Sequence, residues 1–186
     1  MRKLQVVVIF LILIFQACSS DKPDVITTKS GLYGSKKGEF LIKFPEKPNV
    51  MIQENMLANQ KFDAVTFLCS MGIEQKYVVS YVDFPPPFFN SIDIEQFFDQ
   101  SAEAMDRSSD YITMGSRTVG ENDGFDKSIT YKMFSPQTNI NGHITMKMIK
   151  AGTRIYTIMY AAARNRASNE VVDEFVNSFK LYKPKQ

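Results

Sequence analysis

Apolar residues alternate with polar ones along most of this chain, and the alternation predicts β-strands. In residues 39–44, for example, Phe40, Ile42 and Phe44 fall on one face of an extended backbone. Short connections between neighbouring strands favour antiparallel pairing. Further strands are expected at residues 50–57, 61–70, 76–84, 111–121, 125–135, 143–150 and 154–162.

Two stretches repeat apolar residues at helical spacing instead. The first covers about residues 94–108 after Asp93, and the second covers about residues 169–179 after Ser168. Aspartate and serine are both favoured N-cap residues. Because several strands precede each helix, the pattern predicts an α+β fold with an antiparallel sheet of about six to eight strands and two separate main helices.

The N-terminus has the pattern of an export signal. Arg2 and Lys3 precede an apolar run over residues 4–15, and Ala17 leads into Cys18. A positive flank, an apolar run and a small residue at the cut are typical of secretory signals. The run is shorter than the roughly 20 apolar residues that a transmembrane helix needs. An uncleaved anchor and a plain secretory signal remain as alternatives.

The junction before Cys18 resembles the lipobox of bacterial lipoproteins, in which signal peptidase II cuts before the cysteine and acyl chains are attached to it. The lipobox prefers leucine three residues before the cysteine, where this chain has Phe15. The resemblance implies that residues 1–17 are a signal peptide and that Cys18 carries palmitate-type chains. Several acyl chains hold a protein firmly in a membrane. Ser19 resembles the residue of outer-membrane lipoproteins at this place, so we expect anchoring in the outer membrane.

The remaining chain suits one domain. Residues 18–38 are polar and rich in turn-forming residues, which predicts a tether that becomes ordered near Leu32 and Tyr33. Residues 39–183 then form a single domain, long enough to bury a core without metal or disulfides. Removing residues 1–17 leaves 20 basic and 20 acidic residues. A neutral domain gives no electrostatic reason to expect nucleic acid or an acidic lipid surface as a partner.

Few residues suggest chemistry. With Cys18 lipidated, Cys69 has no partner for an internal disulfide, and its apolar neighbours predict a buried strand thiol. His143 is the single histidine, whereas zinc sites usually draw on several His or Cys. Residues 121–126 lack the spacing of a calcium loop and favour a hairpin turn at residues 123–124. We therefore expect neither a metal nor a cofactor.

The most unusual stretch of the domain is Phe84-Pro-Pro-Pro-Phe-Phe89. Prolines stiffen an extended backbone, and they could hold Phe84, Phe88 and Phe89 outward as a contact for a partner, a lipid or a ligand. The alternative is that the loop folds back and covers the core beneath the first helix, as apolar loop residues usually do.

Four short motifs resemble an uncharacterised group of bacterial secreted proteins and lipoproteins. They are Gly38–Pro45, Tyr77–Pro85, Gly152–Tyr156 and Phe175–Phe179, in that order. The group is similar in architecture to the PsbP-like fold, an antiparallel sheet between helices, so the resemblance implies that the sheet of this chain lies between its two main helices. Residues 119–124 depart from the G-x-P-G turn of many members. The group has no common activity, so the resemblance implies none.

Three functions remain open. The first is a non-catalytic lipoprotein that binds or helps to assemble another envelope component. The second is a carrier or sensor of a small apolar ligand, suggested by 12% aromatic residues and ten methionines. The third is a hydrolase using His143, because a Ser–His–Asp triad needs only one histidine. No G-x-S-x-G elbow supports the third hypothesis.

Overall fold

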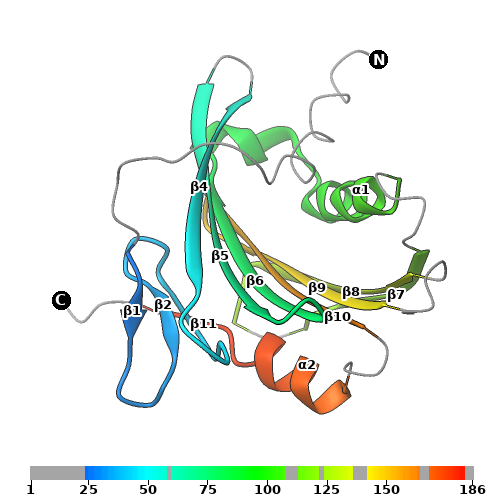
Figure 1. Ribbon diagram of the computed structural model, residues 1–186. Coiled ribbons are helices and arrows are strands. Elements are labelled where there is room, and N and C mark those ends of the chain that lie inside the picture. Colours follow the sequence, from blue (N-terminus) through cyan, green and yellow to red (C-terminus); the bar gives the residue numbers. More distant parts are fainter. Residues whose placement is uncertain are drawn as a thin grey trace.

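The protein is an α+β structure with two antiparallel sheets, seen in a computed structural model. The structure describes residues 24–57, 60–107, 113–121, 124–135, 142–163 and 168–182. The larger sheet is strongly curved, and a helix lies against each of its faces (Figure 1). This arrangement confirms the predicted α+β class and the antiparallel pairing.

The larger sheet has seven strands in the order β4-β5-β6-β10-β9-β8-β7. Two runs of hairpins build it, because β4 to β6 pair in succession and β7 to β10 pair in succession. Pairing of β6 with β10 joins the two runs. The strands are β4 (Asn49–Leu57), β5 (Gln60–Met71), β6 (Gln75–Asp83), β7 (Thr113–Val119), β8 (Lys127–Ser135), β9 (Gly142–Ala151) and β10 (Arg154–Ala163).

The smaller sheet has four short strands in the order β1-β2-β3-β11. It brings both ends of the described chain together, because β11 follows the last helix and pairs with β3. We call it the small sheet. Its strands are β1 (Ile26–Thr27), β2 (Tyr33–Ser35), β3 (Phe40–Ile42) and β11 (Lys180–Leu181).

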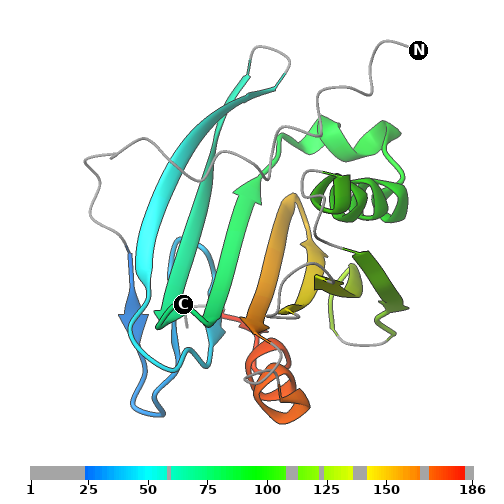
Figure 2. The same cartoon turned by 45° about the vertical axis from the view of Figure 1, so that its right-hand side comes forward.

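The larger sheet has a hydrophobic cluster on each face. On one face, β3 and α2 (Asn169–Val176) cover the odd-numbered residues of β5 and β6, with Phe40 and Phe175 fully buried. On the other face, α1 (Ile94–Arg107) packs its buried Phe98 and Ala102 against β8 and β9. Figure 2 shows α1 over the β7–β9 side of the sheet, away from β4 and β5.

Both helices begin at the predicted caps. The Asp93 carboxylate accepts hydrogen bonds from the backbone N–H groups of Glu95 and Gln96, at 2.9 and 3.2 Å. The Ser168 hydroxyl accepts one from the N–H of Val171, at 3.1 Å. Each cap satisfies donors that the first helical turn leaves without a partner.

The predicted tether of residues 18–38 is too long. Residues 24–38 belong to the fold, because β1 pairs with β2 and β2 pairs with β3. Ser35 is completely buried and donates a hydrogen bond to the Asp24 carboxylate, at 3.1 Å. Strands of two or three residues are too short to show an alternating pattern, so the sequence suggested only a polar segment.

The second helix is shorter than predicted. It ends at Val176 rather than near Phe179, because Asn177 and Ser178 turn the chain into β11. Phe179 still packs in the core, where its ring lies 5.8 Å from that of Phe40. The predicted turn at residues 123–124 falls partly outside the described residues.

Candidate binding surface

The proline-rich loop folds back over the core. Phe84 is only 7% exposed, and its ring stacks on Phe88 with centroids 4.3 Å apart. Phe89 and Phe97 of α1 meet Phe84 edge-on, at 5.6 and 6.1 Å. Prolines 86 and 87 begin a 3₁₀ helix, η2 (Pro86–Ser91), which turns the loop inward. Phe84 is therefore part of the core beneath α1, whereas the half-buried Phe88 and Phe89 keep some surface for a contact.

Beside this loop, the α1-side face of the larger sheet continues beyond α1. Strand register aligns two rows of side chains across β4, β5, β6 and β10 on this face. We call these residues the uncovered strip, because neither of the described helices covers them; they are Met51, Thr66, Ser80 and Thr157 in one row and Leu68, Val78 and Met159 in the other. All seven are uncharged and half-buried.

Three apolar members of the uncovered strip pack against neither hydrophobic cluster of the described residues. They are Met51, Leu68 and Val78. The same two rows continue on β9 into Met148 and Met146, which are buried in the cluster beneath α1. Met146 and Met148 are buried and the strip is not, because α1 covers this face of the sheet only over the strands near β7. An uncharged strip of this kind, part apolar and part hydroxyl, suits a partner or ligand without charge.

A second feature is a hollow of about 370 Å³ between the end of α2 and the start of β8. It combines an apolar floor with two lysines, and Lys147 Nζ lies 5.3 Å from the centre of the Phe125 ring. Such a lining can accept a small molecule with an apolar body and a negative group. The lining residues are Gly124, Phe125, Lys147, Val176, Asn177, Phe179, Lys180 and Leu181.

Cys69 is a buried thiol, as predicted, and is 4% exposed on β5. Burial raises its pKa, which keeps the thiol protonated at neutral pH. The side chain packs in the cluster beneath α2. These surroundings favour a structural role. Cys18 lies outside the described residues, so its lipidation stays a prediction.

His143 lies near the start of β9 with an exposed side chain. Its cross-strand neighbours are Phe134 and Ala162, neither of which can act as a nucleophile or an acid. Within the described residues, no hydrogen bond joins His143 to a serine or a carboxylate, so the structure does not assemble the triad there. The described residues also contain no group of three His, Cys, Asp or Glu that could hold a metal ion.

The four motifs that resemble the bacterial lipoprotein group meet at the junction of the two sheets. Arg154 forms a two-pronged ion pair with Asp83, at 2.6 and 2.8 Å. Its guanidinium lies 4.9 Å from the centre of the Tyr81 ring. The Tyr156 hydroxyl donates to the backbone carbonyl of Gly38, at 2.8 Å. The motifs therefore have a common structural role, since each supplies part of the junction between the two sheets.

Electrostatics strengthen this junction. Burial alone lowers the pKa of Arg154, but its hydrogen bonds with Asp83 and Tyr156 outweigh burial and hold the pKa above the ordinary value. Arg154 therefore stays charged. Paired, hydrogen-bonded charges of this kind hold elements in one register. We assign the junction a structural role.

Sequence reasoning missed both the uncovered strip and the hollow. Alternation along a strand assigns each strip residue to one of the two faces of the sheet. It does not show whether a helix covers that face at that position. Only the order of strands and the position of α1 decide which positions stay uncovered. Within the described ranges, no helix is both long and apolar enough to cross a membrane.

No family model matches the chain, and no curated protein matches it. A crystal structure from Bacteroides thetaiotaomicron, solved at 1.50 Å, aligns with 82% of this chain at 9% identity and a TM-score of 0.49. The chain spans about half of that protein, 48% of its length. PA94 from Pseudomonas aeruginosa, of unknown function, aligns over 61% of this chain and 84% of its own, at 6% identity and a TM-score of 0.40. Neither likeness supports a statement about the fold or the function of this chain.

Proposed function

We propose that this chain is a non-catalytic lipoprotein of the bacterial envelope that binds or helps to assemble another envelope component. The observation that carries the proposal is the N-terminal sequence, in which a positive flank and a short apolar run end at Cys18. Lipidation there would anchor the protein in a membrane, and Ser19 favours the outer membrane.

We further propose membership of the lipoprotein group with the Gly38–Pro45 opening, and a PsbP-like arrangement of the domain. Convergence of the four motifs on one junction supports the first part, since residues that fit together are expected to occur together. An antiparallel sheet with one helix against each face supports the second part.

The uncovered strip is the surface that best suits such binding. It lacks charge, is half-buried, and includes three apolar side chains that pack against neither hydrophobic cluster of the described residues, Met51, Leu68 and Val78. An uncharged protein segment could pack there and complete the coverage that α1 begins. Phe88 and Phe89 lie on the same side and could extend this contact.

Lipidation is tested by radiolabelled palmitate. Wild-type protein should incorporate the label in its bacterial host, whereas Cys18→Ser should not, because the acceptor thiol is gone. Cys69→Ser is the matched control and should label as the wild type does. Equal labelling of wild type and Cys18→Ser would contradict lipidation at this site.

Partner binding is tested by photocrosslinking in intact cells. A photoreactive amino acid at Val78 should trap one discrete envelope protein, because Val78 belongs to the uncovered strip. The same amino acid at Lys132, an exposed residue on the opposite face of β8, is the control. No adduct from position 78, or the same adducts from both positions, would contradict binding at the strip.

A small apolar ligand is the second candidate for the same surface. The specific observation in its favour is the pair of methionines in the strip, Met51 and Met159, since methionine adapts its shape to varied apolar groups. Native mass spectrometry of protein purified from its host should then show a bound lipid-like molecule that Val78→Arg removes. A ligand-free spectrum would count against this candidate.

A further inference from the structure

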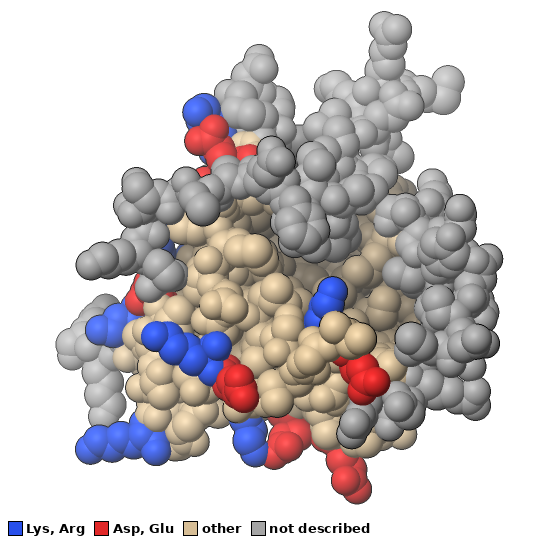
Figure 3. Space-filling view, in the orientation of Figure 1, with Lys and Arg blue, Asp and Glu red and all other residues tan. Residues whose placement is uncertain are grey.

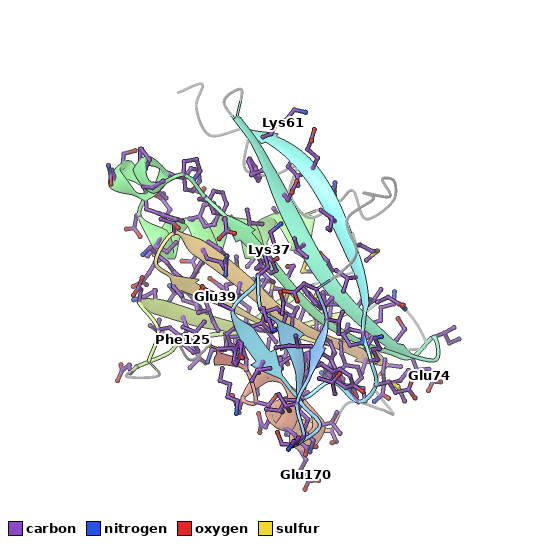
Figure 4. All side chains as sticks on the ribbon, turned by 90° about the vertical axis from the view of Figure 1, so that its left-hand side faces the viewer. Lys37, Glu39, Lys61, Glu74, Phe125 and Glu170 are labelled. Atoms are coloured by element: carbon purple, nitrogen blue, oxygen red, sulfur yellow. The ribbon has the colours of Figure 1, made fainter. Side chains whose placement is uncertain are left out.

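One end of the small sheet gathers three segments that lie far apart in the sequence. The Asp24 carboxylate accepts hydrogen bonds from the Ser35 hydroxyl and from the backbone N–H of Lys37, at 3.1 and 2.6 Å. The N–H of Tyr182 donates to the carbonyl of Glu39, at 2.7 Å. The entry into the fold, the β2–β3 turn and the exit from β11 therefore lie together. We call this region the tether end; Figure 4 labels Lys37 and Glu39 within it.

The fold begins closer to Cys18 than the sequence suggested. Only six residue steps separate Cys18 from Asp24, which span at most about 20 Å at roughly 3.3–3.6 Å per residue. A domain of this length is about 40 Å across, from a radius of gyration of about 15 Å. Such a tether cannot reach around the domain, so a lipid on Cys18 would keep the tether end near the bilayer.

Two described lysines lie at the tether end, and three more are close to it in the sequence. Lys36 and Lys37 are exposed in the β2–β3 turn, and no described acidic side chain forms an ion pair with either. Lys22 precedes Asp24 by two positions, and Lys183 and Lys185 follow Tyr182 within three positions. The nearby acids are Asp21, next to Lys22 in the sequence, Asp24, which accepts two hydrogen bonds from uncharged groups, and Glu39, which lies 3.4 Å from Arg154. Figure 3 shows basic side chains over the small sheet, at the lower left, with acidic side chains beside some of them.

We propose that the domain rests on an anionic bilayer surface through its tether end, which orients β7 away from the membrane. The inference rests on the proposed lipidation of Cys18 and adds the surface and the partner, an anionic lipid bilayer. Lysines near such a surface are attracted to its lipid phosphates, an effect that falls off within about 10 Å. Lys36 and Lys37 lie at the tether end, on the side of the domain that the short tether would keep near the bilayer.

Headgroup quenching tests this orientation with the full lipidated protein. An environment-sensitive fluorophore is placed at Lys36→Cys, or at Thr118→Cys on the edge strand β7, which lies across the molecule from the small sheet (Figure 1). Both carry Cys69→Ala, and the lipid blocks Cys18. In vesicles of phosphatidylethanolamine and phosphatidylglycerol with nitroxide-labelled headgroups, we expect severalfold stronger quenching at position 36 than at position 118.

Two further experiments separate the effect of the short tether from the effect of the lysines. A spacer of roughly 20 Gly and Ser residues between Lys22 and Pro23 spans about 25 Å on average and should reduce the contrast between the two positions. Replacing phosphatidylglycerol with phosphatidylcholine should also reduce it, because the lysines then lose their anionic partner. An unchanged contrast in that arm would show that the lysines contribute nothing.

The result that overturns the orientation is equal quenching at both positions, or stronger quenching at position 118, in protein whose intact mass includes the lipid. An intact mass without lipid at Cys18 would instead refute the proposed function. The same preparation therefore distinguishes the two failures.

Discussion

At the scale of single residues, Gly38 shows how closely the two sheets approach each other. A Cβ atom at this position would lie 2.6 Å from Cε1 of Tyr81 and 3.0 Å from the Ser35 hydroxyl oxygen. The backbone N–H of Gly38 also donates to that hydroxyl, at 2.6 Å. The absence of a side chain thus lets the β2–β3 turn sit directly against β6.

Gly38→Ala should therefore destabilise the domain. Overpacking of a tight site costs about 1–3 kcal/mol, because the Tyr81 ring or the β2–β3 turn must shift. Urea unfolding of the domain without its lipid anchor would measure the change in free energy of unfolding. Lys37→Ala, at the exposed neighbouring position, should change it by less than about 0.5 kcal/mol. Equal stability of Gly38→Ala and wild type would show that the turn can relax at no cost.

Buried tyrosines make stability depend on alkaline pH. Burial, assisted by the neighbouring Tyr160, raises the pKa of Tyr77 to about 12. Burial, with the hydrogen bond to Asp99, also raises the pKa of Tyr131. In the unfolded chain a tyrosine ionises near pH 10. The stabilising contribution is therefore complete below pH 10 and is lost as pH rises through the folded-state pKa.

We expect the free energy of unfolding to fall above pH 10, by at most about 1.4 kcal/mol per pH unit for each such tyrosine. Tyr77→Phe should make this fall shallower, because one late-titrating phenol is gone. Urea titrations at several pH values, with phenolate absorbance recorded in parallel, would measure both effects. An identical slope in wild type and Tyr77→Phe would contradict the role of Tyr77.

At the scale of elements, α1 is fixed at its start by its cap and along its polar side by ion pairs. Arg117 of β7 donates to Asp99 at 2.7 Å and to Glu95 at 2.8 Å. Lys127 of β8 also pairs with Glu95. These groups are partly exposed, so each pair adds little to stability. They instead specify where α1 lies across the sheet, and hence where the uncovered strip begins.

Removal of the α1 cap should cost a measurable amount. Asp93→Ala leaves the N–H groups of Glu95 and Gln96 without their acceptor, and we expect a loss of about 1 kcal/mol in the free energy of unfolding. Asp93→Ser retains a capping oxygen and should recover most of it. Thermal or urea unfolding would measure both variants. Equal destabilisation by alanine and serine would show that the carboxylate acts through charge rather than through capping.

At the scale of the whole molecule, the small sheet is part of the folded domain. Phe40 of β3 meets Phe67 and Tyr156 of the larger sheet edge-on, with centroids 5.0 and 6.2 Å apart. The β2 strand in turn pairs with β3 and completes this layer. The first strands therefore contribute to the larger core through β3.

A domain that begins at Glu39 should be less stable than one that begins at Asp24. The truncation removes β1, β2 and their backbone hydrogen bonds, each worth about 1 kcal/mol net, so we expect a loss of at least about 2 kcal/mol. Urea midpoints of the two proteins, both without lipid, would measure it. Equal midpoints would show that residues 24–38 add nothing to stability, as expected for the long tether that the sequence suggested.

The sequence alone determined the elements that depend on local pattern. Alternation located the seven strands of the larger sheet, and Asp93 and Ser168 marked the two helix starts. These features are readable because burial periodicity and capping depend on neighbours within a few residues. The export signal and the cysteine at its end are local in the same way, and for them the sequence provides the whole basis of the prediction.

The tertiary structure decided what depends on contacts between distant segments. Pairing of β6 with β10 and of β3 with β11 joins residues that are far apart in the chain. That pairing draws the four motifs into one junction and the first strands into the fold. It also leaves Val78 uncovered while Met146, in the same row, is buried under α1. Val78 and Met146 thus have different surroundings although both lie on the α1-side face of the sheet. The reason is that coverage by a helix depends on how the whole molecule packs and not on the strand itself.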